Sequence, residues 1–94
     1  MKTLRFAKDA DQFAAKIYND MKKNDFCCDE EYKISRNAFD ELNKHYASMA
    51  LELEGKLLEM YNQDDTNEGE DICFSIGSSE YKGEYVLMVN VDWD

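Results

Sequence analysis

The feature that most constrains the fold is a long apolar alternation near the carboxyl end. Tyr85, Leu87, Val89, Val91 and Trp93 alternate with Val86, Met88, Asn90 and Asp92. One face of this segment is apolar throughout and the other is apolar in part, which is typical of a central β-strand. The alternation also predicts that Tyr85 and Trp93 face the core.

Two further segments are expected to pair with this strand. Residues 72–76 alternate between apolar and small side chains, and the Gly77-Ser78-Ser79 stretch is expected to begin a turn. Residues 2–6 form a short strand in which Lys2, Leu4 and Phe6 share a face. A hairpin plus this first strand predicts a three-stranded antiparallel sheet.

The clearest helix signal lies in residues 9–23. Asp9 can cap the helix and Gln12 can complete a capping box. Apolar side chains then recur at helical spacing and form a single stripe, consisting of Ala10, Phe13, Ala14, Ile17, Tyr18 and Met21. Lys22 and Lys23 suit the negative end of the helix dipole.

Residues 24–34 show no firm period and are expected to be a connector, pinned to the core by Phe26, Tyr32 and Ile34. A second helix is expected after Ser35, an N-cap, and its apolar stripe continues to about Asn62. Gly55 makes a bend or break there a possibility. The stripe consists of Phe39, Leu42, Tyr46, Met49, Leu53, Leu57 and Met60.

A second stripe of Ala47, Leu51, Glu54 and Leu58 lies beside the first. It indicates either a helix wedged between the sheet and the first helix or a dimer seam or partner surface.

The order β-α-α-β-β predicts an α+β, two-layer domain with both helices on one face of the sheet. Its 94 residues correspond to a single domain, 1–94. No apolar run is long enough to span a bilayer, and the amino terminus lacks the apolar stretch of a signal peptide. A cytoplasmic protein is therefore expected.

Charge is the most informative functional feature. The chain carries 11 basic and 21 acidic side chains, a net charge of −10, and residues 62–94 hold nine acids and one lysine. Residues 1–23 instead carry six basic and three acidic side chains. Binding to duplex DNA or to an anionic membrane is not expected, because both repel carboxylates. A basic partner surface would attract this chain, although simple solubility is an alternative explanation.

Specific chemistry finds little support in the sequence. The odd cysteine count argues against a disulfide framework, and the neighbouring Cys27 and Cys28 are poor partners for each other, so free thiols are expected. His45 could pair with either thiol, but no local signature supports an oxyanion site. Zinc ligands lack paired spacing, and a calcium-loop pattern starting at Asp64 ends on Ser75 instead of glutamate. No catalytic residue, metal or cofactor is predicted.

The remaining hypothesis is that acidic side chains recognise a partner protein, with Tyr81 as an exposed aromatic anchor. The residues expected to bind a partner are Asp29, Glu30, Glu31, Asp64, Asp65, Glu68, Glu70, Asp71, Glu80, Tyr81 and Glu84.

The whole-chain profile resembles the small acidic anti-CRISPR proteins of phages and prophages. The resemblance is carried by the 94-residue length, the −10 charge, the acidic stretches 29–31 and 64–71 and the β-α-α-β-β order, without a diagnostic motif. It implies a non-enzymatic inhibitor that covers the basic DNA-binding surface of a CRISPR effector complex in the host cytoplasm. The basic amino-terminal helix departs from a uniformly acidic mimic and leaves open a surface that also touches bound RNA.

Two alternatives stay open. The chain could be another phage-type regulator that binds a host protein through the extra stripe at Leu51 and Leu58. It could also be a homodimeric structural protein that pairs through the second helix. An enzyme ranks third.

Overall fold

The fold is α+β, and the computed structural model describes residues 2–7, 9–44, 48–64 and 71–93. Within these ranges the elements are, in chain order, β1 (Lys2–Thr3), α1 (Ala10–Lys22), β2 (Glu30–Ile34), α2 (Arg36–Asn43), α3 (Ser48–Gln63), β3 (Ile72–Tyr81) and β4 (Glu84–Trp93). The described helices include none that is both long and apolar enough to cross a bilayer.

The described strands form one four-stranded sheet in the order β1-β2-β4-β3. The prediction of a three-stranded antiparallel sheet was wrong, because β1 runs parallel to β2 while β2 and β3 are antiparallel to β4. The central position predicted for the strand at residues 85–93 is confirmed, since β4 has a neighbour on each side. β1 is also shorter than the predicted 2–6 strand, although Leu4 still donates its N–H to the carbonyl of Lys33 at 2.9 Å.

The strand that sequence analysis missed is β2, which lies in the expected connector. Tyr32 and Ile34 are buried, whereas Glu31 and Lys33 are exposed, so the segment does alternate. The alternation covers only five residues and carries three charges, which made it too short and too polar to predict a strand. The prediction that Phe26, Tyr32 and Ile34 pin this segment to the core is confirmed.

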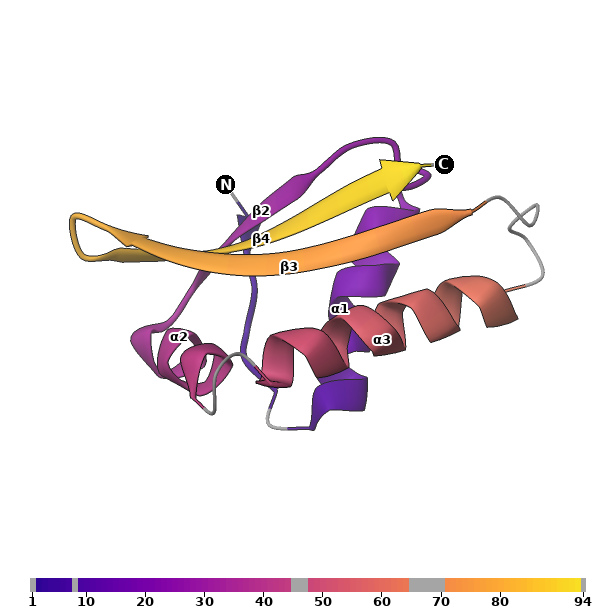
Figure 1. Cartoon of the computed structure of the whole chain (residues 1–94). Helices are drawn as coiled ribbons and strands as arrows, with labels where there is room; N and C mark the ends of the chain where they lie inside the picture. The colour runs from indigo at the N-terminus through magenta and orange to yellow at the C-terminus, as the bar shows by residue number, and fades with distance from the viewer. Residues whose placement is uncertain (1, 8, 45–47, 65–70, 94) are drawn as a thin grey trace.

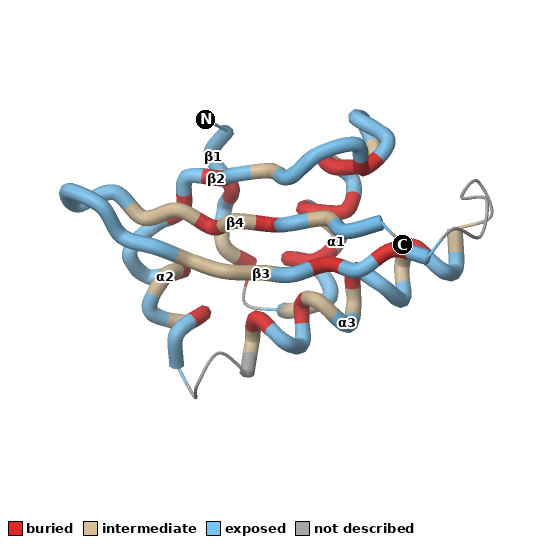
Figure 2. Tube along the Cα trace, turned by 45° about the horizontal axis from the view of Figure 1, so that its top comes forward, coloured by how far each residue is buried: buried red, intermediate tan, exposed pale blue. Residues whose placement is uncertain are grey.

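The three described helices all lie on one side of the sheet, as Figure 1 shows. Buried positions concentrate where the sheet lies over the helices, while the turn end of the β3–β4 hairpin is exposed (Figure 2). The one-sided, two-layer arrangement was predicted. It leaves the opposite face of the sheet without a covering helix, and Val86 and Met88 alternate there with the core-facing Leu87 and Val89.

The predicted single helix over residues 36–62 was wrong, because the described helices α2 and α3 are separate. Lys44 has an extended backbone, with φ −70° and ψ 143°, whereas Gly55 lies inside α3. The break lets two apolar faces reach one core, since Leu42 of α2 and Leu57 of α3 are both buried. Tyr46 and Ala47 of the predicted stripes, together with His45, lie outside the described residues.

The β3–β4 turn lies later than the sequence suggested. Gly77, Ser78 and Ser79 remain in β3, and the chain reverses at Lys82 and Gly83, whose φ angles are 51° and 78°. Two consecutive positive φ values are the geometry of the type I′ turn, which matches the twist of a two-residue hairpin. Glycine supplies the second position without a Cβ penalty.

Trp93 faces the core side of the sheet, as its place in the alternation predicted, with its ring centroid 6.0 Å from that of the buried Tyr61. The Trp93 side chain is 38% exposed, and its indole Nε1 donates to the carbonyl oxygen of Phe26 at 3.1 Å. Tyr85 is partly buried and packs against Phe39, with ring centroids 5.0 Å apart. The end of a strand has fewer neighbours than its middle, so the alternation alone did not set the burial of Trp93.

Candidate docking surface

The carboxyl-terminal end of β4 collects carboxylates from separate segments of the chain. Asp92 is paired with Cys73 of β3, and Trp93 is paired with Ile72, so Asp71 reaches the same end of the sheet. The indole–carbonyl bond from Trp93 to Phe26 brings the 24–29 loop there as well. We call this surface the acidic end. Its members are Asp25, Asp29, Asp71 and Asp92, which are exposed, and the half-exposed Glu30.

The 24–29 loop owes its path to two residues in the left-handed region. Asp25 and Phe26 both have φ 54°, and the Phe26 N–H donates to the Met21 carbonyl at 3.1 Å. This turn ends α1 and sends the Phe26 ring into the core, where it contacts the rings of Tyr61 and Phe74. Asp25, beside it in the chain, stays exposed.

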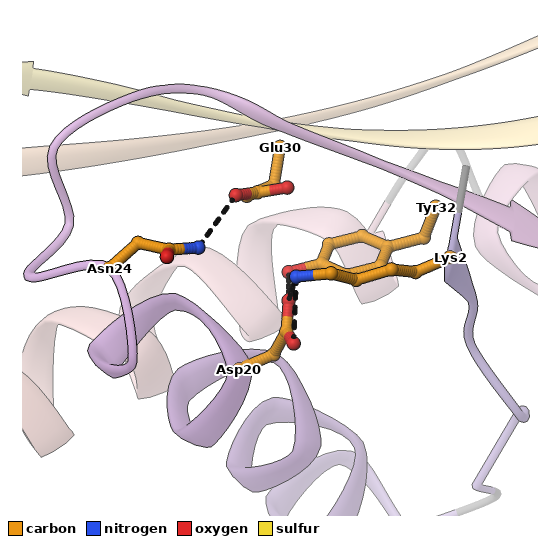
Figure 3. Close-up of polar contacts among 5 residues, drawn as sticks. All are labelled: Lys2, Asp20, Asn24, Glu30 and Tyr32. Atoms are coloured by element: carbon orange, nitrogen blue, oxygen red, sulfur yellow. Dashed lines mark hydrogen bonds and ion pairs between the residues drawn. The ribbon is translucent and has the colours of Figure 1, made fainter.

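Two carboxylates of the acidic end also hold the loop in place. Asp29 Oδ1 accepts the backbone N–H of Val91 at 2.8 Å. Glu30 Oε1 accepts a hydrogen bond from the Asn24 side-chain amide at 3.2 Å (Figure 3). The loop is therefore tied to β4 and to its own start, and these carboxylates keep a defined position at the surface.

The structure separates the predicted partner-binding residues. Asp29, Glu30 and Asp71 belong to the acidic end, whereas Glu80, Tyr81 and Glu84 lie beside the β3–β4 turn. Glu31 lies between the two, opposite Met88 in the middle of β4. The strands run nine residue steps between these ends, which corresponds to about 30 Å. Tyr81 is 70% exposed, as an anchor residue would need to be, but it cannot share one small contact surface with the acidic end.

Asp64 was also predicted to bind a partner, and it has internal partners instead. Its carboxylate accepts a hydrogen bond from Tyr18 Oη at 2.6 Å and pairs with the Lys22 ammonium, and the side chain is only 15% exposed. It therefore ties the end of α3 to α1. Asp65, Glu68 and Glu70 lie outside the described residues.

A second polar cluster joins β1, α1 and β2 (Figure 3). Asp20 accepts hydrogen bonds from Lys2 Nζ at 3.1 Å and from Tyr32 Oη at 2.8 Å. Burial acts to raise the pKa of Asp20, but the bonds from Tyr32 and Lys2 outweigh it and leave that pKa below its usual value. Burial and the bond to Asp20 raise the pKa of Tyr32, so the phenol stays a donor.

Beside this cluster lies a groove of about 370 Å³ between β1 and α1, with Lys2, Lys16 and Lys23 in its lining. Among the described residues, no ion pair joins Lys16 or Lys23 to a carboxylate, so the groove has an excess of positive charge. Three of the six basic side chains of residues 1–23 thus lie together beside α1.

The residues expected to bind a partner did not include two members of the acidic end, Asp25 and Asp92. Asp92 lies on the outward row of the predicted strand, and the pairing of β3 with β4 would have placed it beside Asp71. No sequence signal marked Asp25, since its position depends on the left-handed turn after α1.

The exposed carboxylates of the acidic end can bind a partner through charge. Exposed carboxylates act only as acceptors, and they pair with the ammonium and guanidinium groups of other molecules. The described residues contain no group of three or more His, Cys, Asp or Glu side chains placed to hold a metal ion. No protein-family model matches this chain, and neither a curated protein nor a solved structure gives a match.

Proposed function

We propose that this chain is a non-enzymatic inhibitor whose acidic end docks on the basic, nucleic-acid-binding surface of a CRISPR effector complex. Docking there blocks the binding of target DNA. The observation that carries the proposal is the convergence of Asp25, Asp71 and Asp92 with Asp29 and Glu30 at one end of the sheet. The whole-chain resemblance to acidic anti-CRISPR proteins supplies the identity of the partner.

Charge complementarity gives this docking its physical basis. A cluster of like charges held by a folded scaffold needs no ordering when it meets a basic partner, so little conformational entropy is lost. Opposite potentials also speed the encounter, and this attraction is screened by salt. Lysines and arginines that normally hold DNA phosphates would pair with these carboxylates instead.

The test is competition between this protein and target DNA for purified effector complexes. Asp71→Lys combined with Asp92→Lys reverses two exposed charges in the acidic end. Glu80→Lys combined with Glu84→Lys makes the same change beside the β3–β4 turn and serves as the matched control. We expect the first variant to inhibit at least about tenfold less well, because each lost ion pair at a charged interface contributes about 1 kcal/mol. The control variant should inhibit about as well as the unmodified protein.

Raising the salt concentration from about 50 to about 500 mM should weaken inhibition by the unmodified protein, since the Debye length falls severalfold. Failure to bind any effector complex offered would overturn the choice of partner. Equal loss of inhibition in the two charge variants would overturn the choice of the acidic end.

A second candidate rests on exposed apolar side chains of α3. Leu51 is 66% exposed and Leu58 is 37% exposed, and they lie seven residues apart on one side of the helix. This face suits a partner protein bound through apolar contact. If it is the binding surface, Leu51→Glu abolishes partner binding while the Asp71→Lys, Asp92→Lys variant leaves it unchanged.

A further inference from the structure

Two adjacent thiols lie within the 24–29 loop. Cys27 and Cys28 are both exposed and unoxidised in the structure, and their sulfur atoms are 3.2 Å apart. We propose that this pair is a site of reversible oxidation by hydroperoxides, which converts the two thiols to a disulfide between neighbouring residues. The proposal does not depend on the docking function.

The geometry places the two sulfur atoms in reach of each other. Neighbouring Cα atoms are about 3.8 Å apart across a trans peptide, which is less than the span of an ordinary disulfide. A disulfide here is therefore strained, which explains why adjacent cysteines make poor permanent partners. The same strain makes the disulfide easy to reduce, and labile disulfides of this kind are the ones that cycle. Closure requires the sulfur atoms to approach from 3.2 Å to a bond length of about 2.05 Å.

The loop is held firmly on both sides of the pair. On one side, Phe26 is buried and its carbonyl accepts the Trp93 indole N–H. On the other, Asp29 accepts the N–H of Val91. Only Cys27 and Cys28 lie between these two attachments, so the attachments keep the thiols together. Strain from ring closure must also reach Trp93, whose indole bonds to the residue before Cys27.

The oxidation takes two steps. The thiolate of one cysteine attacks one oxygen of the hydroperoxide and breaks the O–O bond, which leaves a sulfenic acid on that cysteine and releases an alcohol or water. The other thiol then attacks the oxidised sulfur, the S–S bond forms, and the hydroxyl leaves with the proton of the attacking thiol as water. In sum, two thiols and one hydroperoxide give one disulfide, one alcohol or water, and a further water.

The two thiols share a hydrogen bond in which either sulfur can be the donor. This bond and the charge of Cys27 raise the pKa of the Cys28 thiol, and the carboxylates of Glu30 and Asp29 act in the same direction.

The test is to treat the dilute protein with hydrogen peroxide and to measure free thiols, intact mass and Trp93 fluorescence. The chain has three cysteines and one tryptophan, so the number of free thiols and the source of the tryptophan emission are both unambiguous. We expect free thiols to fall from three to one, the mass to fall by two hydrogen atoms, and dithiothreitol to restore both. Trp93 is expected to change its emission in step with the mass.

Cys73→Ser is the matched control, since Cys73 is exposed on β3 and should play no part. This variant should lose the two hydrogen atoms as the unmodified protein does. Cys27→Ser and Cys28→Ser should not lose them, and peptide mapping of the unmodified protein should find the bond between residues 27 and 28. The proposal is overturned if peroxide only adds oxygen to the pair, if Cys73→Ser prevents the loss of hydrogen, or if Trp93 emission does not respond to oxidation.

Discussion

Asp20 has a structural role in the fold. It lies on α1 and receives hydrogen bonds from Tyr32 on β2 and Lys2 on β1, so one side chain joins three elements. The parallel pairing of β1 with β2 is short, with the registers Lys2 to Tyr32 and Thr3 to Lys33. A two-residue strand has little pairing energy of its own, and Asp20 helps to hold it.

Asp20→Asn should lower the free energy of unfolding at pH 7 by about 1 kcal/mol, because the charge-assisted bonds become neutral ones. The pKa of Asp20 is lower in the folded protein than in the unfolded chain. Its contribution is therefore complete above the unfolded pKa of about 3.9 and disappears as the pH falls through the folded value. Urea unfolding at several pH values tests this, with Asp40→Asn on the exposed surface of α2 as a control that should change little. The prediction would be contradicted if Asp20→Asn and the unmodified protein still differed in their free energy of unfolding at a pH below both the folded and the unfolded pKa of Asp20.

Two glycines should respond to alanine in opposite ways. Gly55 lies inside α3 with open space where a Cβ would be, so Gly55→Ala should stabilise the protein by about 1 kcal/mol. Gly83 has φ +78° in the hairpin turn, so Gly83→Ala should destabilise it by about 1 kcal/mol. In thermal unfolding each change corresponds to a shift of about 4–8 °C. A shift in the same direction for both variants would contradict the left-handed turn at Gly83 or the helical position of Gly55.

At the scale of elements, the outer edge of β3 is held by α3. The Glu54 carboxylate accepts the backbone N–H of Ile76 at 2.7 Å, a donor that β4 does not use. Edge strands present unpaired N–H groups that can recruit another chain, and an acceptor from a neighbouring helix occupies one of them. Glu54 belonged to the predicted second stripe because of its helical spacing. The sequence did not explain why a carboxylate stands in that otherwise apolar stripe.

Glu54→Ala should cost about 1 kcal/mol of stability and increase self-association, because it frees an edge N–H. Glu52→Ala is the matched control: the side chain lies on the same helix and is exposed. Chemical denaturation and light scattering at raised protein concentration measure the two effects. If the two alanine variants behave alike, the bond to Ile76 does not protect the edge.

At the scale of the whole molecule, exposed carboxylates from distant parts of the chain gather at one end of the sheet. The acidic end brings carboxylates of the 24–30 segment together with Asp71 and Asp92. Like charges held close together repel each other, and the folded state bears that cost because the unfolded chain can separate them.

Added salt should therefore raise the unfolding midpoint of this protein, by screening repulsion in the acidic end. Asp71→Asn combined with Asp92→Asn removes part of that repulsion, so this variant should be more stable than the unmodified protein at about 10 mM salt and gain less from added salt. Thermal unfolding across a sodium chloride series measures the difference. An identical salt response in the variant and the unmodified protein would show that these carboxylates do not repel each other appreciably.

Local signals in the sequence were sufficient for several features. Asp9 accepts the N–H of Asp11 and Ser35 accepts that of Ala38, so both predicted N-caps are confirmed. Phe13, Ile17 and Met21 are buried along α1 as their spacing predicted. Each of these features depends on residues within one or two turns of chain, which is the range over which spacing and capping act.

What the sequence by itself determined is therefore the α+β class, the first helix, the central strand and the surplus of negative charge. Only the tertiary structure decided that residues 30–34 join the sheet, that the second helical stretch breaks at Lys44, and that Asp25 and Asp92 meet at one end while Glu80 and Glu84 lie at the other. The physical reason is the distance along the chain over which each kind of interaction acts. Side-chain periodicity reports how a segment meets its immediate neighbours, whereas strand order and the grouping of charges follow from contacts between segments far apart in the chain.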